Sequence, residues 1–127
     1  MGVPTDRRYL ASHEWHKLEG GICTIGITKF AADELTDITY VSLPAAGTEV
    51  KAGKPFGEIE SVKATSDLIS GVTGVITEVN KKLNDAPELV NNDSFGEGWM
   101  VKVKVSDPAT FEKLMTAQAY EGQLKKH

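Results

Sequence analysis

Short runs of β-branched and other apolar residues, separated by glycine, proline and polar turn formers, recur through most of the chain. Runs of this length and composition are typical of β-strands. They cover residues 38–43, 48–50, 55–61, 65–69, 74–79 and 100–105. In the last run Val101, Val103 and Val105 alternate with lysines, as expected of a strand that buries one side. Many short strands with regular turn signals predict a sandwich or barrel.

The N-terminal part of the chain has the pattern of a hairpin followed by a short helix. Residues 9–27 read as two strands joined at Gly20-Gly21, because paired glycines supply the positive φ angles of a tight turn. Thr28 occupies an N-cap position, and a helix is predicted over residues 29–35. Its apolar side consists of Phe30, Ala31 and Leu35.

Two helices are predicted near the C-terminus. Asp107-Pro108 is typical of an N-cap with proline at the first helical position, and this helix is expected to reach about Met115. The residues that it is expected to bury are Phe111, Leu114 and Met115. Thr116 is predicted to cap the second helix, and Lys125-Lys126 would complement the negative end of that helix's dipole.

The composition excludes several functional classes. The 127 residues suit one domain with an ordinary core. With 14 Lys and Arg against 18 Asp and Glu, the formal net charge is −4, so we expect binding to neither nucleic acid nor membrane. No signal peptide or membrane span is apparent, which predicts a cytoplasmic location, or the mitochondrial matrix for a processed eukaryotic chain. Cys23, in an apolar run, is expected to be a buried hydrophobic residue.

Two motifs that resemble ligand sites are weak. His13 and His16 are three residues apart in a predicted strand, where they point to opposite faces, whereas the metalloprotease motif needs histidines four apart on one helical face. Gly96-Glu97-Gly98 lacks the preceding strand and following helix of a phosphate-binding loop, and is expected to lead into Trp99. No Ser-His-Asp or Cys-His grouping is apparent. We therefore expect neither a metal site nor a catalytic centre.

Lys63 lies between two predicted strands, residues 55–61 and 65–69, and is therefore placed near the tip of a hairpin. From this pattern alone, a solubilising lysine on a turn is the favoured interpretation. A lysine at a tip is also what a modifying ligase requires, because it is reachable and its small neighbours Ser61 and Ala64 do not shield it.

The segment around this lysine, Glu60-Ser61-Val62-Lys63-Ala64-Thr65-Ser66-Asp67, resembles the lipoylation hairpin of glycine cleavage H proteins. Other segments resemble the same family in the same order: Ser12-His13-Glu14-Trp15, Ile25-Gly26-Ile27-Thr28, Val41-Ser42-Leu43-Pro44, Gly74-Val75-Ile76-Thr77-Glu78-Val79-Asn80, Asp85-Ala86-Pro87-Glu88-Leu89-Val90-Asn91 and Gly96-Glu97-Gly98-Trp99. The resemblance covers about residues 7–121. The chain departs from the family pattern at Thr36 (usually glycine), Gly71 (usually proline) and Ser94-Phe95 (commonly Pro-Tyr).

The resemblance implies a barrel-sandwich hybrid of the lipoyl/biotinyl type. This is a mainly β fold, with a short helix in the N-terminal half and helices at the C-terminus. One carrier domain is expected over residues 1–127, with a C-terminal helical segment at about 107–125. The implied cofactor is (R)-lipoate, joined covalently to Lys63 by a lipoate ligase or a lipoyl/octanoyl transferase.

The same resemblance implies partners and further site residues. Such a carrier is not an enzyme and shuttles the aminomethyl intermediate of glycine decarboxylation between three proteins: glycine decarboxylase (P protein), aminomethyltransferase (T protein) and dihydrolipoamide dehydrogenase (L protein). Glu60 is expected to help the ligase recognise the hairpin. Ser12, Glu14 and Asp67 match polar positions that line the cleft where the loaded arm rests. Solvated surface carboxylates remain the alternative interpretation of Glu14, Glu60 and Asp67.

Four alternative functions differ from this one in what they require of the sequence. A biotin carrier normally has methionines on both sides of its lysine, and a lipoyl domain of a 2-oxoacid dehydrogenase usually has Asp before it, whereas Lys63 lies between Val62 and Ala64. A carrier that acts mainly as a lipoyl-relay donor for other proteins would use the same lysine and stays open. A hydrolase is the weakest alternative, because no catalytic constellation is apparent.

Overall fold

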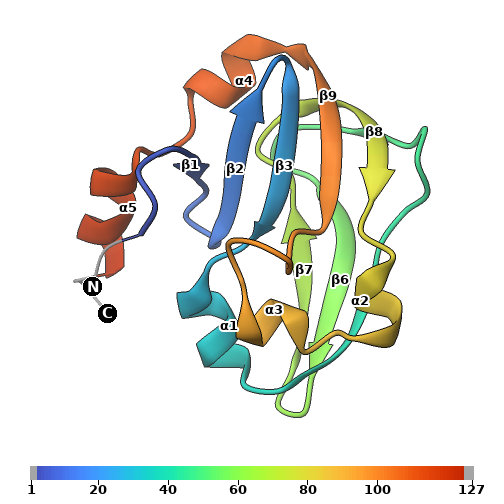
Figure 1. Ribbon diagram of the computed structural model, residues 1–127. Helices are drawn as coiled ribbons and strands as arrows, with labels where there is room; N and C mark the ends of the chain where they lie inside the picture. Colours follow the sequence, from blue (N-terminus) through green and yellow to red (C-terminus); the bar gives the residue numbers. More distant parts are fainter. Residues whose placement is uncertain (1–2, 125–127) are drawn as a thin grey trace.

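The computed structural model describes residues 3–124, and its larger sheet is a six-stranded antiparallel one (Figure 1). Its strands, in order across the sheet, are β1 (Arg8–Tyr9), β2 (Glu14–Glu19), β3 (Ile22–Ile27), β9 (Val101–Asp107), β8 (Thr73–Val79) and β5 (Glu49–Val50). Strands β2 and β3 form the predicted hairpin, with φ angles of 55° at Gly20 and 82° at Gly21. Glycine adopts such angles without steric cost, which explains the pair at this turn.

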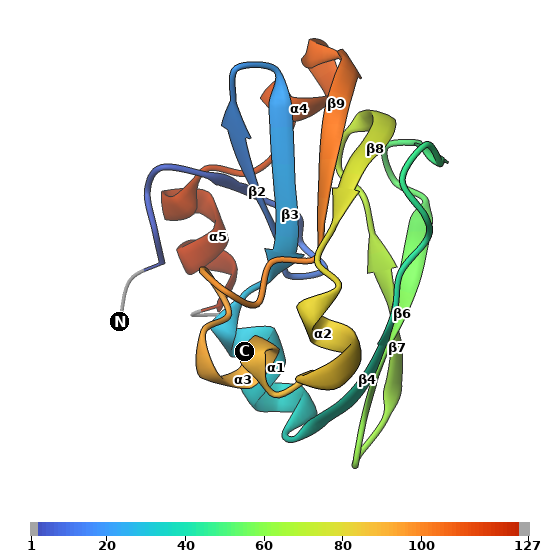
Figure 2. The same ribbon diagram turned by 45° about the vertical axis from the view of Figure 1, so that its right-hand side comes forward.

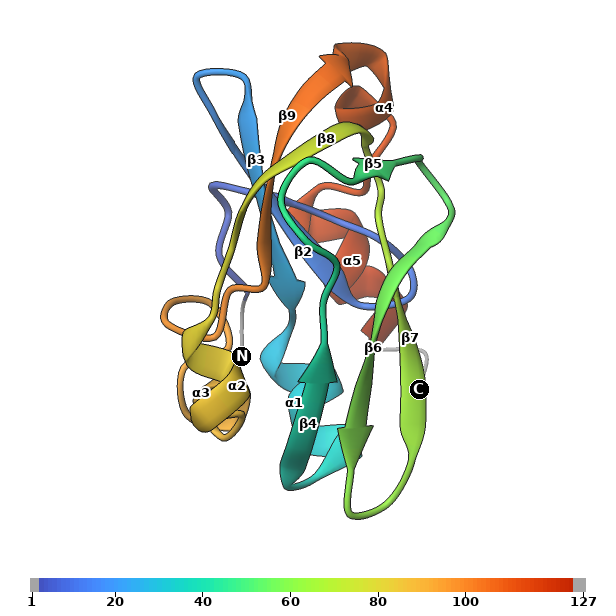
Figure 3. The same ribbon diagram turned by 90° about the vertical axis from the view of Figure 1, so that its right-hand side faces the viewer.

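A three-stranded antiparallel sheet packs against the first and faces the viewer in Figure 3. Its strands are β4 (Ile38–Ser42), β6 (Pro55–Ser61) and β7 (Thr65–Ile69), in that order. Buried side chains from the two sheets form one core cluster, which includes Cys23, Ile25, Val103, Val41, Ile59 and Leu68. The prediction of a mainly β sandwich is confirmed, as is the burial of Cys23, and burial raises the pKa of its thiol to about 12.

The structure has five short helices among the described residues: α1 (Lys29–Leu35), α2 (Lys82–Asp85), α3 (Leu89–Asn92), α4 (Pro108–Glu112) and α5 (Ala117–Leu124). Figure 2 shows α1, α2 and α3 gathered at one end of the larger sheet. Both predicted threonine caps are confirmed. Thr28 Oγ1 accepts a hydrogen bond from the Ala31 N–H (3.3 Å), and Thr116 Oγ1 accepts one from the Ala119 N–H (3.2 Å).

The prediction for α4 is wrong in two respects. The helix ends at Glu112 rather than near Met115, because Met115 forms an antiparallel bridge with Tyr9 instead. The Asp107 side chain makes no capping hydrogen bond, since this residue still belongs to β9. Leu114 is buried as predicted, whereas Phe111 and Met115 are half-buried. The predicted role of Lys125-Lys126 lies outside the described residues.

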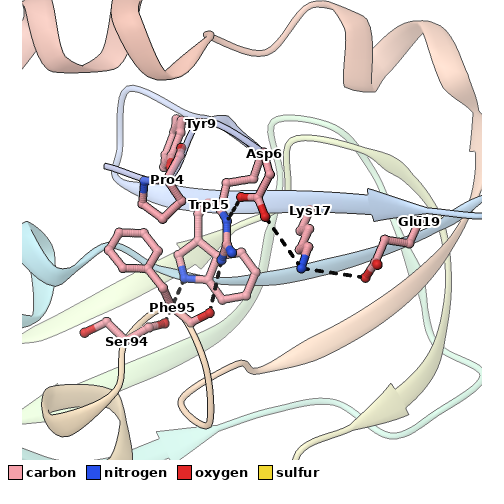
Figure 4. A network of polar contacts seen from close by, with 9 residues as sticks. Pro4, Asp6, Tyr9, Trp15, Lys17, Glu19, Ser94 and Phe95 are labelled. Carbon is pink, nitrogen blue, oxygen red and sulfur yellow. Dashed lines mark hydrogen bonds and ion pairs between the residues drawn. The ribbon is translucent and has the colours of Figure 1, made fainter. Parts of the chain in front are cut away.

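A second, smaller core cluster joins the segment before β2, β2 itself and α5. Figure 4 shows three of its members, Tyr9, Trp15 and Phe95. The buried members of the cluster are Tyr9, Trp15, Ala117 and Tyr120. The guanidinium of Arg7 lies 4.7 Å from the centre of the Trp15 ring and donates to the Phe95 carbonyl (3.1 Å). The Trp15 Nε1–H donates to the Ser94 carbonyl at 2.9 Å. Because Trp15 is buried against this cluster, β2 is covered on both faces.

Candidate functional site

Lys63 lies at the tip of the β6–β7 hairpin, which forms the lower end of the molecule in Figures 1 to 3. The ladder between the strands ends at the Glu60–Thr65 pair, so residues 61–64 form the turn. The predicted position near a hairpin tip is therefore confirmed. Lys63 is exposed, and its neighbour Val62 has 69% of its surface accessible.

The turn is closed by Ser61. Its backbone N–H donates to the Ala64 carbonyl at 2.8 Å. Its hydroxyl oxygen accepts from the N–H groups of Lys63 (3.2 Å) and Ala64 (3.0 Å). Serine commonly bonds to nearby backbone in this way, which stabilises a turn at little steric cost. The Lys63 backbone is therefore held while its side chain stays exposed.

The tip rests on the turn between α1 and β4. The Val62 N–H donates to the Asp37 carbonyl at 3.1 Å. The Lys63 ammonium donates to the Glu34 carbonyl, also at 3.1 Å. Glu34 is in the last turn of α1, where carbonyl groups lack partners within the helix and favour a cation.

A shallow cleft of about 240 Å³ opens beside α1, close to this contact. Its lining residues are Ser12, His13, Phe30, Ala31, Glu34, Leu35 and Ser66. The apolar residues among them are those predicted for the apolar side of α1. Glu34 both lines the cleft and bonds to Lys63, so the lysine is attached at the edge of the cleft.

Glu14 is linked to the cleft through Ser12. The Ser12 hydroxyl donates to Glu14 Oε1 at 2.5 Å, and the Ile69 N–H donates to Glu14 Oε2 at 2.9 Å. Only 2% of Glu14 is exposed, and burial raises the pKa of its carboxyl to about 7 although these hydrogen bonds act in the opposite direction. A cation that comes close to such a carboxyl favours its ionised form.

One wall of the cleft is fixed by a chain of polar contacts that ends in α5. His13 has a φ angle of 82°, and its Nδ1 lies 2.7 Å from the Tyr120 hydroxyl. That hydroxyl lies 2.8 Å from Thr28 Oγ1, the N-cap of α1. The contacts tie the two helices to the segment before β2. The two histidines thus have different partners, because His13 contacts Tyr120 whereas His16 bonds to Gly71.

His16 bonds to the base of the hairpin, which is the end of β7 with the residues that follow it, 69–71. Its side chain is fully buried, and its Nε2 accepts a hydrogen bond from the Gly71 N–H at 2.9 Å. Nε2 is therefore unprotonated. Burial lowers the pKa of His16 to about 3, against a smaller raising effect of the Glu14 backbone. A Cβ at position 71 would lie 2.5 Å from Leu114 Cδ2, so this site is also closely packed.

Glu60 and Asp67 lie along the exposed part of the hairpin. Glu60 pairs with Thr65 on one side and Tyr40 on the other, and Asp67 pairs with Glu58. Since side chains alternate along a strand, Asp67 lies on the face of β7 opposite to Ser66, which lines the cleft. The structure thus brings together Ser12 and Glu14, and it leaves Asp67 and Glu60 on the outer side of the hairpin.

The roles of several residues were missed from the sequence: His13, Glu34 and Ser66 line the cleft, Tyr120 contacts His13, and His16 bonds to Gly71 at the base. The sequence signals were the pair His13 and His16, which was rejected as a metal motif, and Gly71, which departs from the family pattern. The described residues contain no group of three or more His, Cys, Asp or Glu side chains that could hold a metal ion. Within residues 3–124 no helix is long and apolar enough to cross a membrane.

Comparison with known proteins agrees with this geometry. Residues 7–127 match the family model described as glycine cleavage H-protein. The chain is 50% identical over 121 residues to the glycine cleavage system H protein of Bacillus subtilis, with 95% of each chain covered. It is 49% identical over 123 residues to a probable glycine cleavage system H protein of Haloarcula marismortui, with 97% of each covered.

The fold agrees as well. A crystal structure of a glycine cleavage system H protein from Mycobacterium marinum superposes with a TM-score of 0.89 at 39% identity, covering 97% of this chain and 99% of the other. The two packed sheets and the hairpin thus have the barrel-sandwich architecture that was predicted. The chain belongs to the glycine cleavage H-protein family.

Proposed function

We propose that the chain is a lipoyl carrier of glycine cleavage, with (R)-lipoate joined as an amide to Lys63. The observation that carries this proposal is the position of Lys63, exposed at the tip of a two-stranded hairpin and adjacent to a cleft. A ligase can reach such a lysine, because the neighbouring side chains of the turn are small or directed outward. In this role the chain acts as one carrier domain and not as a catalyst.

The residues present fit such a group. When bound, the lipoyl group supplies a cyclic disulfide that accepts the aminomethyl unit. The cleft offers an apolar wall from α1 and a buried carboxyl at Glu14, which suits an arm that is largely apolar and ends in an amine. A protonated amine near Ser12 and Glu14 would favour the charged form of that carboxyl.

The remaining site residues have supporting roles in this proposal. Glu60, exposed and three residues before the lysine, helps the ligase recognise the hairpin. Ser12 and Glu14 hold the loaded arm. Asp67, on the outer face of β7, would act on an arm that crosses the hairpin edge.

The proposed partners are the P, T and L proteins, between which the chain carries the aminomethyl intermediate, and a lipoate ligase or lipoyl/octanoyl transferase. The proposed location is the cytoplasm. Because catalysis in this system depends on the partners' cofactors, the carrier contributes positioning and recognition. A lipoyl-relay donor would use the same lysine, and transfer assays with P protein and glycine distinguish the two functions.

The direct test is intact-mass measurement after co-expression with a lipoyl ligase. We expect one lipoyl mass increment on the wild-type chain and on Lys54→Arg, a matched exposed lysine, and none on Lys63→Arg. An unmodified wild-type chain would refute the proposal. The cleft is tested separately with Glu14→Gln, which keeps the side-chain size and should shorten the lifetime of the loaded form. An unchanged lifetime would remove Glu14 from the arm site.

A further inference from the structure

The turn that supports the hairpin tip contains a strained residue. Thr36 follows α1 with φ 64° and ψ −143°. This region is populated almost only by glycine, and a β-branched side chain is unfavourable there. A strained turn persists only if its surroundings hold it.

Asn91 of α3 supplies that restraint. Its Nδ2 donates to the Thr36 carbonyl at 2.7 Å, and its Oδ1 accepts from the Ile38 N–H at 3.0 Å. The two bonds bracket Asp37 and use both polar ends of one side-chain amide. The orientation of the amide follows from these partners, since a flipped amide would face a donor with a donor.

The bracketed residue is the one that the hairpin tip contacts. The Asp37 carbonyl accepts from the Val62 N–H, next to the carrier lysine. Two further contacts join the tip to this region: Ser61 pairs with Ile38 of β4, and the Lys63 ammonium donates to the Glu34 carbonyl of α1. The ladder between β4 and β6 is itself irregular here, between Ile38 and Tyr40. The position of the tip therefore depends on the turn.

We propose that Asn91 is a positioning residue for the carrier lysine, acting through the Thr36–Ile38 turn on the Asp37–Val62 hydrogen bond. The proposal rests on the proposed function of Lys63 for its biological meaning. Within residues 3–124 the Asn91 side chain hydrogen-bonds to Thr36 and Ile38, and not to Lys63 or to a residue of the cleft. It fixes the surface on which the tip rests. It thereby sets the orientation in which Lys63 is presented to a partner protein.

A second asparagine provides a matched control. Asn80 also uses both ends of its amide: Nδ2 donates to the carbonyls of Glu97 (2.8 Å) and Trp99 (2.7 Å), and Oδ1 accepts from the Lys82 N–H (3.3 Å). These partners lie in α2 and in the segment before β9, and in the part of the chain that the structure describes they form no hydrogen bond with residues 61–64. Asn80→Asp therefore disturbs an equivalent clamp without disturbing the tip.

The test measures backbone amide hydrogen exchange at Val62 in unmodified, isotope-labelled protein. Because the tip is exposed, exchange there reports local opening rather than global unfolding. In Asn91→Asp the carboxylate faces the Thr36 carbonyl without a donor, so we expect Val62 to exchange about three to ten times faster, the factor that accompanies loss of one ordinary hydrogen bond. Asn91→Ala, which adds no charge, should show the same direction, and Asn80→Asp should leave Val62 unchanged.

Two further measurements separate positioning from general destabilisation. Adding Thr36→Gly to Asn91→Asp removes the strain and should restore most of the Val62 protection. The lipoyl ligase should show a KM about threefold higher for Asn91→Asp with an unchanged kcat, the effect of one weakened contact. Wild-type Val62 exchange in both Asn91 variants, or equal acceleration in Asn80→Asp, would overturn the proposal. Failure of the wild-type chain to accept lipoate would overturn only the proposed function, because the exchange measurement uses unmodified protein.

Discussion

The two ends of the β6–β7 hairpin are held by the same kind of interaction in opposite surroundings. At the tip, the Ser61 hydroxyl accepts from two backbone N–H groups of an exposed turn. At the base, Glu14 and His16 accept from the N–H groups of Ile69 and Gly71, where they are 2% and 0% exposed. In each case a side chain replaces the strand partner that the hairpin lacks.

The comparison shows that the buried base of the hairpin contributes stability, whereas the exposed tip provides access to the lysine. Water can replace a hydrogen bond that is lost at the tip, so breaking one there costs little. At the base, a buried N–H without its acceptor stays unsatisfied, so the penalty is large. The lysine can therefore move with its turn while the strands that carry it remain anchored.

The largest expected effect is at the base. His16→Ala leaves the buried Gly71 N–H without an acceptor and opens a cavity, and it should lower the free energy of unfolding by about 3 kcal/mol. Urea denaturation at pH 7 measures this change. His16→Gln, which fills more of the space and brings an amide oxygen, should lose less. A loss under about 1 kcal/mol in the alanine variant would contradict the assigned role of the base.

The next prediction distinguishes Glu14 from His16, the two acceptors at the base, by the pH dependence of the free energy of unfolding. The pKa of Glu14 is raised to about 7 from 4.5, so its contribution to stability increases as pH falls from 7 to 4.5. The pKa of His16 is lowered to about 3 from 6.5, so its contribution decreases as pH falls from 6.5 toward 3. The two trends oppose each other between about pH 4.5 and 6.5.

Replacing one of the two groups should reveal the pH dependence that the other contributes. In Glu14→Gln the free energy of unfolding should fall with decreasing pH below 6.5, by up to about 1.4 kcal/mol per pH unit, the slope for one proton. In His16→Gln it should rise as pH falls from 7 to 4.5. Urea denaturation across this pH range provides the measurement. Equal pH profiles for the two variants would show that these groups do not titrate as their burial requires.

The smallest effect is expected at the tip. Ser61→Ala removes the acceptor of the Lys63 and Ala64 N–H groups, both of which can turn to water. We expect the free energy of unfolding to change by less than about 0.5 kcal/mol, with faster amide exchange at Lys63. Thermal denaturation and amide exchange measure the two quantities. A change as large as that of His16→Ala would abolish the contrast between tip and base.

The positions where the chain departs from its family pattern show what long-range contacts add. Gly71 has the backbone N–H that a proline lacks, and His16, far away in sequence, accepts its hydrogen bond. Thr36, in a conformation suited to glycine, is held by Asn91. The sequence marked both positions as unusual, but their partners were visible only after folding.

Local pattern by itself determined the strands β6 and β7, the capped helix α1 and the place of Lys63 at a turn. These features depend on alternation, on turn formers and on a side chain bonding to the backbone three residues away, all of which act within a few positions. The early end of α4, the cleft beside α1, the buried pair of His16 and Gly71, and the clamp at Asn91 were decided by the tertiary structure. Each joins residues from different elements, and burial then sets both their pKa values and the cost of breaking their hydrogen bonds.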